Sequence, residues 1–412
     1  MKILFIHQNF PGQFKFLAPA LVKEGHDVFA LRLDKKPFLG ERELNGVRLF
    51  SYTPTISSSL KIHSLISDFE TKIIRAEATL LRAKQLKQNG LFPDLIISHP
   101  GWGESMFIKK VWPKAKLAVY CEYYYQSVGS DVGFDKEFTK SDTSDGCHID
   151  MKNLVHTVQF PSIDFALSPT KWQASTFPLQ FRSKIAVIHD GIDTQVVKPK
   201  ANASVCINND IKITNKDEVL TFVNRNLEPY RGYHILMRSL PELLKKKPNL
   251  RVLLVGGDSV SYGARPTDCK SWKEKFIAEI SPQMPTEFWS RIHFLGRIPY
   301  PIYLELLQVS TVHVYLTYPF VLSWSLLESM SAGCSIVASN TQPVAEYIRH
   351  DEHGLLVDFF DIKGLIDNVI FLLDNKTKRE KLSKNARQLI IDNCDLNTIC
   401  IPKQIEWINS MI

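Results

Sequence analysis

Short apolar runs alternate with longer amphipathic stretches along most of the chain. The first run, Lys2–Ile6, is apolar at consecutive positions, as is typical of a strand buried on both faces in a parallel sheet. A helical stretch over about residues 13–23 follows, Gly25 ends it, and Asp27–Leu31 provides the next strand. The chain is therefore predicted to open with a β-α-β unit.

The same alternation continues into the second half of the chain. Further buried strands are predicted at residues 94–98, 116–121, 164–168, 218–224, 251–255, 291–295, 312–316 and 335–338. A long helical region is predicted at about 60–89, and two successive β/α alternations indicate two Rossmann-like, doubly wound α/β domains. Ligands of open α/β sheets bind beyond the carboxyl ends of the strands, so we expect the site in a cleft between two facing sheets.

Two polar segments interrupt the alternation. Residues 198–216 contain Pro199, several Asn residues and mixed charges, and they mark a domain boundary. We assign residues 1–195 to an N-terminal domain on the acceptor side, 196–395 to a C-terminal domain that binds the donor, and 396–412 to a helix that packs back toward the first domain. Residues 129–150 are rich in Gly, Ser, Asp and Thr and predict a long loop, which is either functional or a surface excursion.

Composition narrows the class of protein. The chain has 412 residues, of which 44% are hydrophobic and 23% charged, with a net charge of +7. The seven cysteines form no C-x-x-C pair, which argues against a disulfide framework or a zinc site. No signal peptide or membrane span is apparent, and no nucleic-acid-binding motif is present. We expect a cytoplasmic protein, with peripheral contact at the inner face of a membrane left open.

Two loops in the first half carry candidate chemistry. Gly12 lies between the first strand and the first helix, where it lets the backbone approach an anionic ligand; a plain turn is the alternative. His99 follows a buried strand in the segment Ser98–Glu104, where it can bind a substrate hydroxyl or move a proton. The alternative for His99 is a loop histidine bonded to the backbone.

Two segments in the second half suggest phosphate and ribose binding. Arg225 and Arg231 bracket a Pro turn, and two guanidinium groups can converge on one diphosphate; two unrelated surface arginines are the alternative. In Pro319–Gly333 a strand leads into a helix whose first turn is predicted to hold Leu326 to Glu328. The Glu328 carboxylate can accept hydrogen bonds from a ribose diol while nearby backbone N–H groups bind phosphate, or it can merely complement the helix dipole.

Taken in order, these segments resemble the retaining glycosyltransferases of family four, which have the GT-B fold. The resemblance spans nearly the whole chain: the Gly12 loop with residues 25–28, the His99 loop, residues 187–193, the Arg225/Arg231 pair, and residues 294–296, 327–333, 343–346 and 353–357. Each motif is weak alone, but their order is specific.

The resemblance implies roles for individual residues. Gly12 is expected near the donor phosphate or the acceptor, His99 at the transferred sugar, and Glu328 at the ribose. Arg225 and Arg231 are expected to hold the diphosphate. Further donor contacts are expected from Ser323, Ser325, Leu326 and Leu327.

Two positions depart from the family pattern. The family usually has Lys at the place of Arg231, and it commonly has a Glu at the place of Phe320, near the donor sugar. A phenyl ring can neither accept a hydroxyl hydrogen bond nor stabilise positive charge as a carboxylate does. This departure leaves open how the sugar is oriented and whether the protein is active.

The predicted reaction is a metal-independent hexosyl transfer (EC 2.4 class) without a cofactor, from a nucleoside diphosphate sugar to a hydroxyl of a carbohydrate, lipid-linked or protein acceptor. Surface polysaccharide or glycoconjugate synthesis of the bacterial type is the expected setting. Trp102, Tyr123 and Tyr124 are candidates for stacking on an acceptor, with partly buried packing as the alternative. The alternatives to a transferase are a nucleotide-sugar epimerase and a catalytically altered nucleotide-sugar-binding protein.

Overall fold

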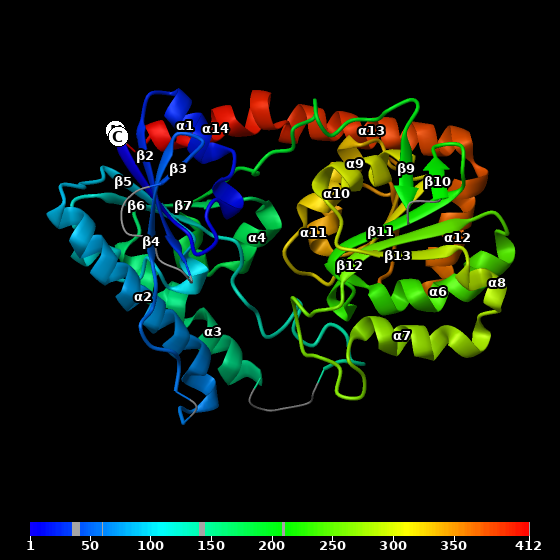
Figure 1. Ribbon diagram of the computed structural model, residues 1–412, viewed down its shortest axis with the longest axis horizontal. Helices are drawn as coiled ribbons and strands as arrows, with labels where there is room; N and C mark the ends of the chain where they lie inside the picture. Colours follow the sequence, from blue (N-terminus) through cyan, green and yellow to red (C-terminus); the bar gives the residue numbers. More distant parts are fainter. Residues whose placement is uncertain (35–41, 60, 140–144, 208–210, 412) are drawn as a thin grey trace. The chain divides into compact units, whose positions relative to one another are not determined.

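A computed structural model describes residues 1–34, 42–59, 61–139, 145–207 and 211–411. The chain divides into two compact units, each with its own parallel sheet (Figure 1). Unit 1 comprises residues 1–132, 140–191 and 396–412, and unit 2 comprises residues 133–139 and 192–395. None of the helices in the described ranges combines the length and apolarity needed to cross a bilayer.

The sheet of unit 1 has eight strands in the order β3-β4-β2-β1-β5-β6-β7-β8, all parallel except the β3–β4 pair. Its strands are β1 (Lys2–Ile6), β2 (Asp27–Leu33), β3 (Arg42–Leu44), β4 (Val47–Tyr52), β5 (Leu95–Ser98), β6 (Lys116–Tyr120), β7 (Phe165–Ser168) and β8 (Ile185–Val187). The chain winds outward from β1 in one direction and returns at β5 in the other. The loops after β1 and β5 therefore meet at the switch point, where open α/β sheets bind ligands.

The described residues of unit 1 form the α-helices α1 (Leu17–Lys23), α2 (Ser64–Gln88), α3 (Asp145–Gln159), α4 (Lys171–Thr176), α5 (Leu179–Arg182) and α14 (Ile401–Asn409). The long helix α2 lies beside α3 (Figure 1). Helix α14 is the last helix of the chain, and it packs against α1. Its Ile408 is fully buried in the same apolar cluster as Ile3 and Phe5 of the first strand.

The sheet of unit 2 has six parallel strands in the order β13-β12-β11-β14-β15-β16, and a separate hairpin is formed by β9 and β10. The strands are β9 (Ser204–Ile207), β10 (Ile211–Thr214), β11 (Val219–Asn226), β12 (Arg251–Gly257), β13 (Ile292–Gly296), β14 (Val312–Tyr315), β15 (Ile336–Ser339) and β16 (Leu355–Val357). The switch point here is between β11 and β14. The loops that follow these two strands are therefore neighbours.

The α-helices of unit 2 are α6 (Tyr233–Lys246), α7 (Trp272–Ile280), α8 (Thr286–Trp289), α9 (Tyr300–Val309), α10 (Trp324–Ser331), α11 (Gln342–Ala345), α12 (Ile362–Asp374) and α13 (Lys376–Cys394). Helix α6 is amphipathic and buries nine residues, among them Tyr233, Leu236 and Leu240. These side chains anchor α6 directly behind the loop after β11.

The predicted doubly wound architecture is confirmed, with two local corrections. The first helix begins at Leu17 instead of residue 13, because Gly12–Phe14 forms a 3₁₀ turn first. The predicted loop at 129–150 is wrong at its end, where helix α3 begins at Asp145, and residues 140–144 lie outside the described part. The polar segment 198–216, at which a domain boundary was expected, contains the β9–β10 hairpin, with 208–210 outside the described part.

Candidate functional site

The switch point of unit 1 gathers a polar network. His7 follows β1, and its Nε2 lies 2.8 Å from Oε1 of Gln13. Gln13 in turn donates from Nε2 to Oε1 of Glu122, at 3.0 Å. Nε2 of His99, which follows β5, lies 3.4 Å from the second oxygen of Glu122. The network thus links the ends of β1, β5 and β6.

Ring packing holds the two histidines of this network in place. The rings of His99 and Trp102 are stacked at 4.1 Å, and the His7 ring meets Trp102 edge-on at 4.9 Å. Burial, together with the nearby His99, lowers the pKa of His7 to about 4, so His7 is neutral at pH 7. His99 also accepts the N–H of Gly101 at 3.3 Å through Nδ1, which leaves Nε2 facing Glu122. The expectation of a backbone-bonded loop histidine and that of a functional one are therefore compatible.

His7, Gln13 and Glu122 were not predicted from the sequence as members of the site, and the carboxylate among them is Glu122. About one-third of the Glu122 side chain is exposed. Burial raises the pKa of Glu122, but hydrogen bonding and charge from His99, with help from Gln13, outweigh it and hold the pKa below its ordinary value. A carboxylate two residues beyond β6 was the available signal, since the carboxyl ends of adjacent parallel strands share one edge.

Gly12 is required by the close approach of the His7 ring. Its φ is +47°, in the left-handed region, and a Cβ built there would lie 2.4 Å from Cε1 of His7. Any larger residue would have to displace the ring that contacts Gln13 and Trp102. The predicted ligand-binding glycine therefore also shapes the histidine network.

The three aromatic acceptor candidates differ in exposure. Tyr123 is 5% exposed, and its hydroxyl is bonded to Ser130 and to Asp131, so the ring is part of the packed interior. Tyr124 is half-buried and packs against Phe177. Trp102, also half-buried, lies directly on His99. Of the three, Trp102 is the one joined to the polar network.

The switch point of unit 2 fixes Arg231. This side chain is 6% exposed, and its Nη1 donates to Oγ1 of Thr317 at 2.8 Å and to the carbonyl of Val321 at 3.1 Å. The guanidinium also lies over the Tyr262 ring, 5.2 Å from its centroid. Arg231 is therefore held against the loop between β14 and α10, as the adjacency of β11 and β14 requires.

Arg225 is exposed at the end of β11, unlike Arg231. Glu228, between them, is fully buried, and its Oε2 accepts the backbone N–H groups of Ser261 and Tyr262 at 2.8 and 3.2 Å. Burial raises the pKa of Glu228, and these two backbone hydrogen bonds, followed by the charges of the two arginines, offset part of that effect. Both arginines thus act on one buried carboxyl, and hydrogen bonds to Thr317 and Val321 fix the guanidinium of Arg231.

Helix α10 begins earlier than predicted. Ser323 caps it by accepting the N–H of Ser325 at 3.3 Å, so Trp324 is its first residue and Glu328 lies in its second turn. The expectation that Glu328 sits in the first turn is therefore wrong. Leu326 and Leu327 are fully buried, which leaves only their backbone for a ligand, and Gly333 follows the helix with φ +85° as expected.

Two tyrosines of α9 orient the Glu328 carboxylate. Tyr300 donates its hydroxyl to Oε1 at 2.8 Å, and Tyr303 donates to Oε2 at 2.9 Å. Tyr303 is 8% exposed and Tyr300 is 45% exposed. Each carboxylate oxygen keeps a further lone pair, which is what two adjacent hydroxyl groups of a ligand would need.

Phe320 is embedded in an aromatic cluster. It is 4% exposed, and its ring lies 4.9 Å from Tyr262 and 5.6 Å from Tyr230. Arg231 lies 5.9 Å from the centroid of the Phe320 ring. The position that commonly carries a carboxylate in the family is therefore an apolar packing position here.

Among the described residues, one group has the spacing of metal ligands, namely Asp135, Glu137 and His234. Both oxygens of Glu137 already accept hydrogen bonds from the guanidinium of Arg238, at 2.6 and 2.7 Å. A guanidinium this close repels a metal cation, and it already occupies the Glu137 oxygens that would serve as metal ligands. The chemistry of this donor set therefore fits an ion-pair network better than a metal centre.

Comparison with known proteins identifies the family. A family model described as Glycosyl transferase family 4 group matches residues 24–197, and one described as Glycosyl transferases group 1 matches residues 207–389. The D-inositol 3-phosphate glycosyltransferase of Corynebacterium efficiens is 26% identical over 211 residues, 49% of this chain and 46% of that protein. Spore coat protein SA of Bacillus subtilis is 26% identical over 223 residues, 52% of this chain and 55% of that protein. The chain thus matches about half the length of these curated relatives.

Solved structures share the fold at low sequence identity. Sucrose-phosphate synthase from Thermosynechococcus elongatus superimposes with a TM-score of 0.73 at 16% identity, covering 100% of this chain and 98% of that one. HepE of Anabaena, solved in complex with UDP and glucose, has a TM-score of 0.67 at 15% identity, with 100% of both chains covered. HepE has also been solved in complex with UDP-glucose.

Proposed function

Because the chain belongs to the glycosyltransferases of family 4 and group 1 and has a GT-B-like fold, we propose that it transfers a sugar from a nucleoside diphosphate sugar to a hydroxyl acceptor, with retention of configuration. The donor binds to unit 2 through the loops after β11 and β14 and the start of α10. UDP-glucose is the first donor to test, since HepE was solved with it.

One observation carries the donor assignment. Arg231 is buried yet cationic, and Thr317 and Val321 hold its guanidinium at the loop that leads into α10. A fixed guanidinium beside a helix N-terminus forms a preorganised site for a diphosphate. Glu328, held by two tyrosine hydroxyls, offers acceptors for the ribose diol. Both groups bind parts that ribonucleoside diphosphate sugars have in common.

The reaction breaks the anomeric C–O bond of the donor and forms a C–O bond to the acceptor. Negative charge grows on the leaving diphosphate, so Arg231, Arg225 and the N–H groups at the start of α10 stabilise the transition state. The acceptor hydroxyl passes its proton to a leaving phosphate oxygen on the same face of the sugar. No metal enters this scheme, because the arginines supply the positive charge. In unit 1, Glu122 orients the ring of His99, which is proposed to contact a sugar substrate.

Calorimetry with UDP and a transfer assay with UDP-glucose test this proposal together. Arg231→Ala is expected to lower transfer by roughly 30- to 1,000-fold, or about 2–4 kcal/mol of transition-state stabilisation. Arg231→Lys is expected to recover part of that loss, because it restores the charge without the fork. Arg265→Ala, an arginine outside the loops after β11 and β14, is the matched control. UDP affinity and transfer unaffected by Arg231→Ala would reject the donor site.

Phe320 favours a second candidate function, a nucleotide-sugar-binding protein without turnover. Its ring occupies the interior position at which a donor-side carboxylate would otherwise stand. Binding of UDP-sugars with neither transfer to a panel of acceptors nor hydrolysis would support this alternative. Conversion of the free nucleotide sugar into an isomer without any acceptor would instead indicate an epimerase.

A further inference from the structure

Residues 133–139, which we call the strap, come from the first half of the chain but belong to unit 2. Asp135, the third residue of the strap, is 4% exposed. Its Oδ2 accepts the hydroxyl of Tyr318 at 2.8 Å and lies 3.1 Å from Nε2 of His234, and its Oδ1 accepts the N–H of Glu137 at 3.0 Å. Burial raises the pKa of Asp135, but the hydrogen bonds from His234 and Tyr318 outweigh it and keep the pKa below its ordinary value.

Two phenylalanines on either side of Asp135 anchor the strap. Phe134 packs against Tyr318 and Phe359, with ring centroids at 5.1 and 5.3 Å. Phe138 packs edge-on against Trp272 at 5.0 Å and against His234 at 5.1 Å. The strap is thus a built part of unit 2 and not a loop lying loosely on its surface.

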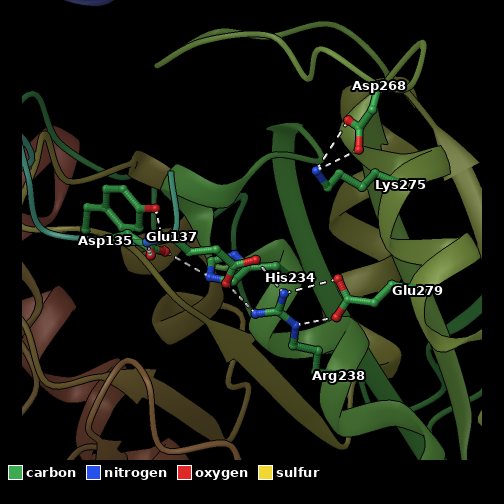
Figure 2. Close-up of polar contacts among 8 residues, drawn as sticks. Asp135, Glu137, His234, Arg238, Asp268, Lys275 and Glu279 are labelled. Carbon is green, nitrogen blue, oxygen red and sulfur yellow. Dashed lines mark hydrogen bonds and ion pairs between the residues drawn. The ribbon is translucent and has the colours of Figure 1, made fainter. Parts of the chain in front are cut away.

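An ion-pair network secures the outer part of the strap (Figure 2). The Arg238 guanidinium bonds both oxygens of Glu137 and both oxygens of Glu279, at distances of 2.5 to 3.1 Å. Glu137 and Glu279 remain partly exposed. Water can replace part of this ion-pair network, so the network contributes less to the order of the strap than the buried Asp135 contacts do.

The buried Asp135–Tyr318 hydrogen bond is connected to the proposed diphosphate site through two further hydrogen bonds. Tyr318, which Asp135 holds through its hydroxyl, donates its backbone N–H to the carbonyl of Tyr230 at 3.0 Å. Tyr318 directly follows Thr317, and Tyr230 directly precedes Arg231. The Thr317 hydroxyl accepts from Arg231 at 2.8 Å. Asp135 therefore fixes a residue that joins the two loops carrying the Arg231 contact.

We propose that Asp135 is a positioning residue for nucleotide-sugar binding, which acts through the hydroxyl of Tyr318 to hold the loop after β14 against Arg231. This inference rests on the proposed function, because it takes the ligand of Arg231 to be a diphosphate. Its consequence is that a segment from the first half of the sequence sets the affinity of the donor site in the second half. Asp135 touches neither the diphosphate nor the reacting atoms.

The test measures local order and UDP affinity in the full-length protein. In Tyr318→Phe and in Asp135→Asn, amide hydrogen exchange over residues 317–322 is expected to rise at least fivefold, and the Kd for UDP is expected to rise about tenfold. The double variant is expected to bind UDP no worse than the weaker single variant, since both changes break one contact. Glu137→Gln, which weakens the outer ion pair and leaves the Tyr318 hydroxyl bonded, is the matched control. Its exchange over 317–322 and its Kd are expected to stay within twofold of the wild type.

Three outcomes would overturn the inference. One is unchanged exchange over 317–322 in both Tyr318→Phe and Asp135→Asn. Another is a lower unfolding midpoint with unchanged UDP affinity, which describes a residue that only stabilises the fold. The third is an equal loss of affinity in Glu137→Gln. Arg231→Ala separates the two proposals: if it leaves the Kd for UDP unchanged while Asp135→Asn still loosens 317–322, the donor assignment fails and the positioning of the loop stands.

Discussion

The Glu122 carboxylate lies 3.4 Å from Nε2 of His99, although 23 positions separate the two residues in the chain. The pair forms because β5 and β6 are adjacent parallel strands whose carboxyl ends reach the same edge of the sheet. A carboxylate at this distance holds the imidazole in one orientation and favours a proton on the nitrogen that faces it. This arrangement makes Glu122 a positioning residue for His99.

Glu122→Gln is expected to lower kcat/KM for transfer about tenfold, or about 1.4 kcal/mol. The amide keeps the size of the side chain but loses the charge that orients His99. Initial rates with UDP-glucose at saturating acceptor provide the measurement. UDP affinity is expected to stay unchanged, since the diphosphate contacts are assigned to unit 2. An equal loss in Glu43→Gln, a glutamate on the exposed side of β3, would show that the effect is one of net charge.

Tyr303→Phe is expected to weaken UDP binding roughly tenfold, or about 1.4 kcal/mol. The change removes the buried hydroxyl that donates to Oε2 of Glu328 and leaves the ring in place. Tyr300→Phe is the matched comparison, and its effect is expected to be smaller because water can replace an exposed hydroxyl. Calorimetric titration of both variants with UDP measures the two losses of affinity. A greater loss in Tyr300→Phe would contradict the assigned order.

Gly12→Ala is expected to destabilise unit 1 by more than about 2 kcal/mol and to disturb the aromatic packing around His7. The added methyl group meets the His7 ring at 2.4 Å, in addition to the strain of a positive φ. Gly25→Ala has the strain without a clash, because nothing lies within 4 Å of its built Cβ. Thermal unfolding of both variants, with near-ultraviolet circular dichroism to report on Trp102, separates the two effects. Equal losses of stability would mean that the His7 ring yields at no cost.

Glu104 is expected to make the stability of unit 1 depend on pH. It is 1% exposed and accepts the Tyr52 hydroxyl at 2.7 Å, and burial raises its pKa, with that hydrogen bond offsetting part of the rise. The folded state therefore keeps a proton that the unfolded chain loses near pH 4.3, so stability falls as the pH rises from about 4.3 through the folded pKa.

Glu104→Gln is expected to remove this slope, because an amide has no proton to lose. The difference in unfolding midpoint between the variant and the wild type should then grow as the pH rises above about 4.3. Glu77→Gln, on the exposed face of α2, is the control and should run parallel to the wild type. Parallel curves for Glu104→Gln and the wild type would contradict a raised pKa for Glu104.

Phe320→Glu is expected to destabilise unit 2 by about 2–4 kcal/mol without raising turnover. The carboxylate would replace a ring packed against Tyr230 and Tyr262, and the nearby Arg231 would repay only part of its desolvation. Phe320→Leu keeps the position apolar and should cost less. Chemical denaturation and initial transfer rates provide the two measurements. A rise in turnover in Phe320→Glu would show that the aromatic position had suppressed the reaction.

The elements with strong local patterns are those that the sequence predicted well. Strand β1 has the predicted bounds, Lys2–Ile6, and β12 begins at the predicted Arg251. The starts of helices were less accurate, because a cap such as Ser323 or a 3₁₀ turn such as Gly12–Phe14 depends on single hydrogen bonds. The Ser323 cap places Glu328 in the second turn of α10 instead of the predicted first turn.

The alternation of buried strands and amphipathic helices, with the order of the short motifs, was enough to determine two doubly wound units and to select Arg231, His99 and Glu328 as candidates. Periodicity is a local property, so it can be seen in the sequence without knowing which elements pack together. Only the tertiary structure decided that Tyr303 holds Glu328 and that Asp135 holds Tyr318, 183 residues away. Such pairs depend on strand order and on where a segment docks, and neither leaves a repeating mark in the sequence.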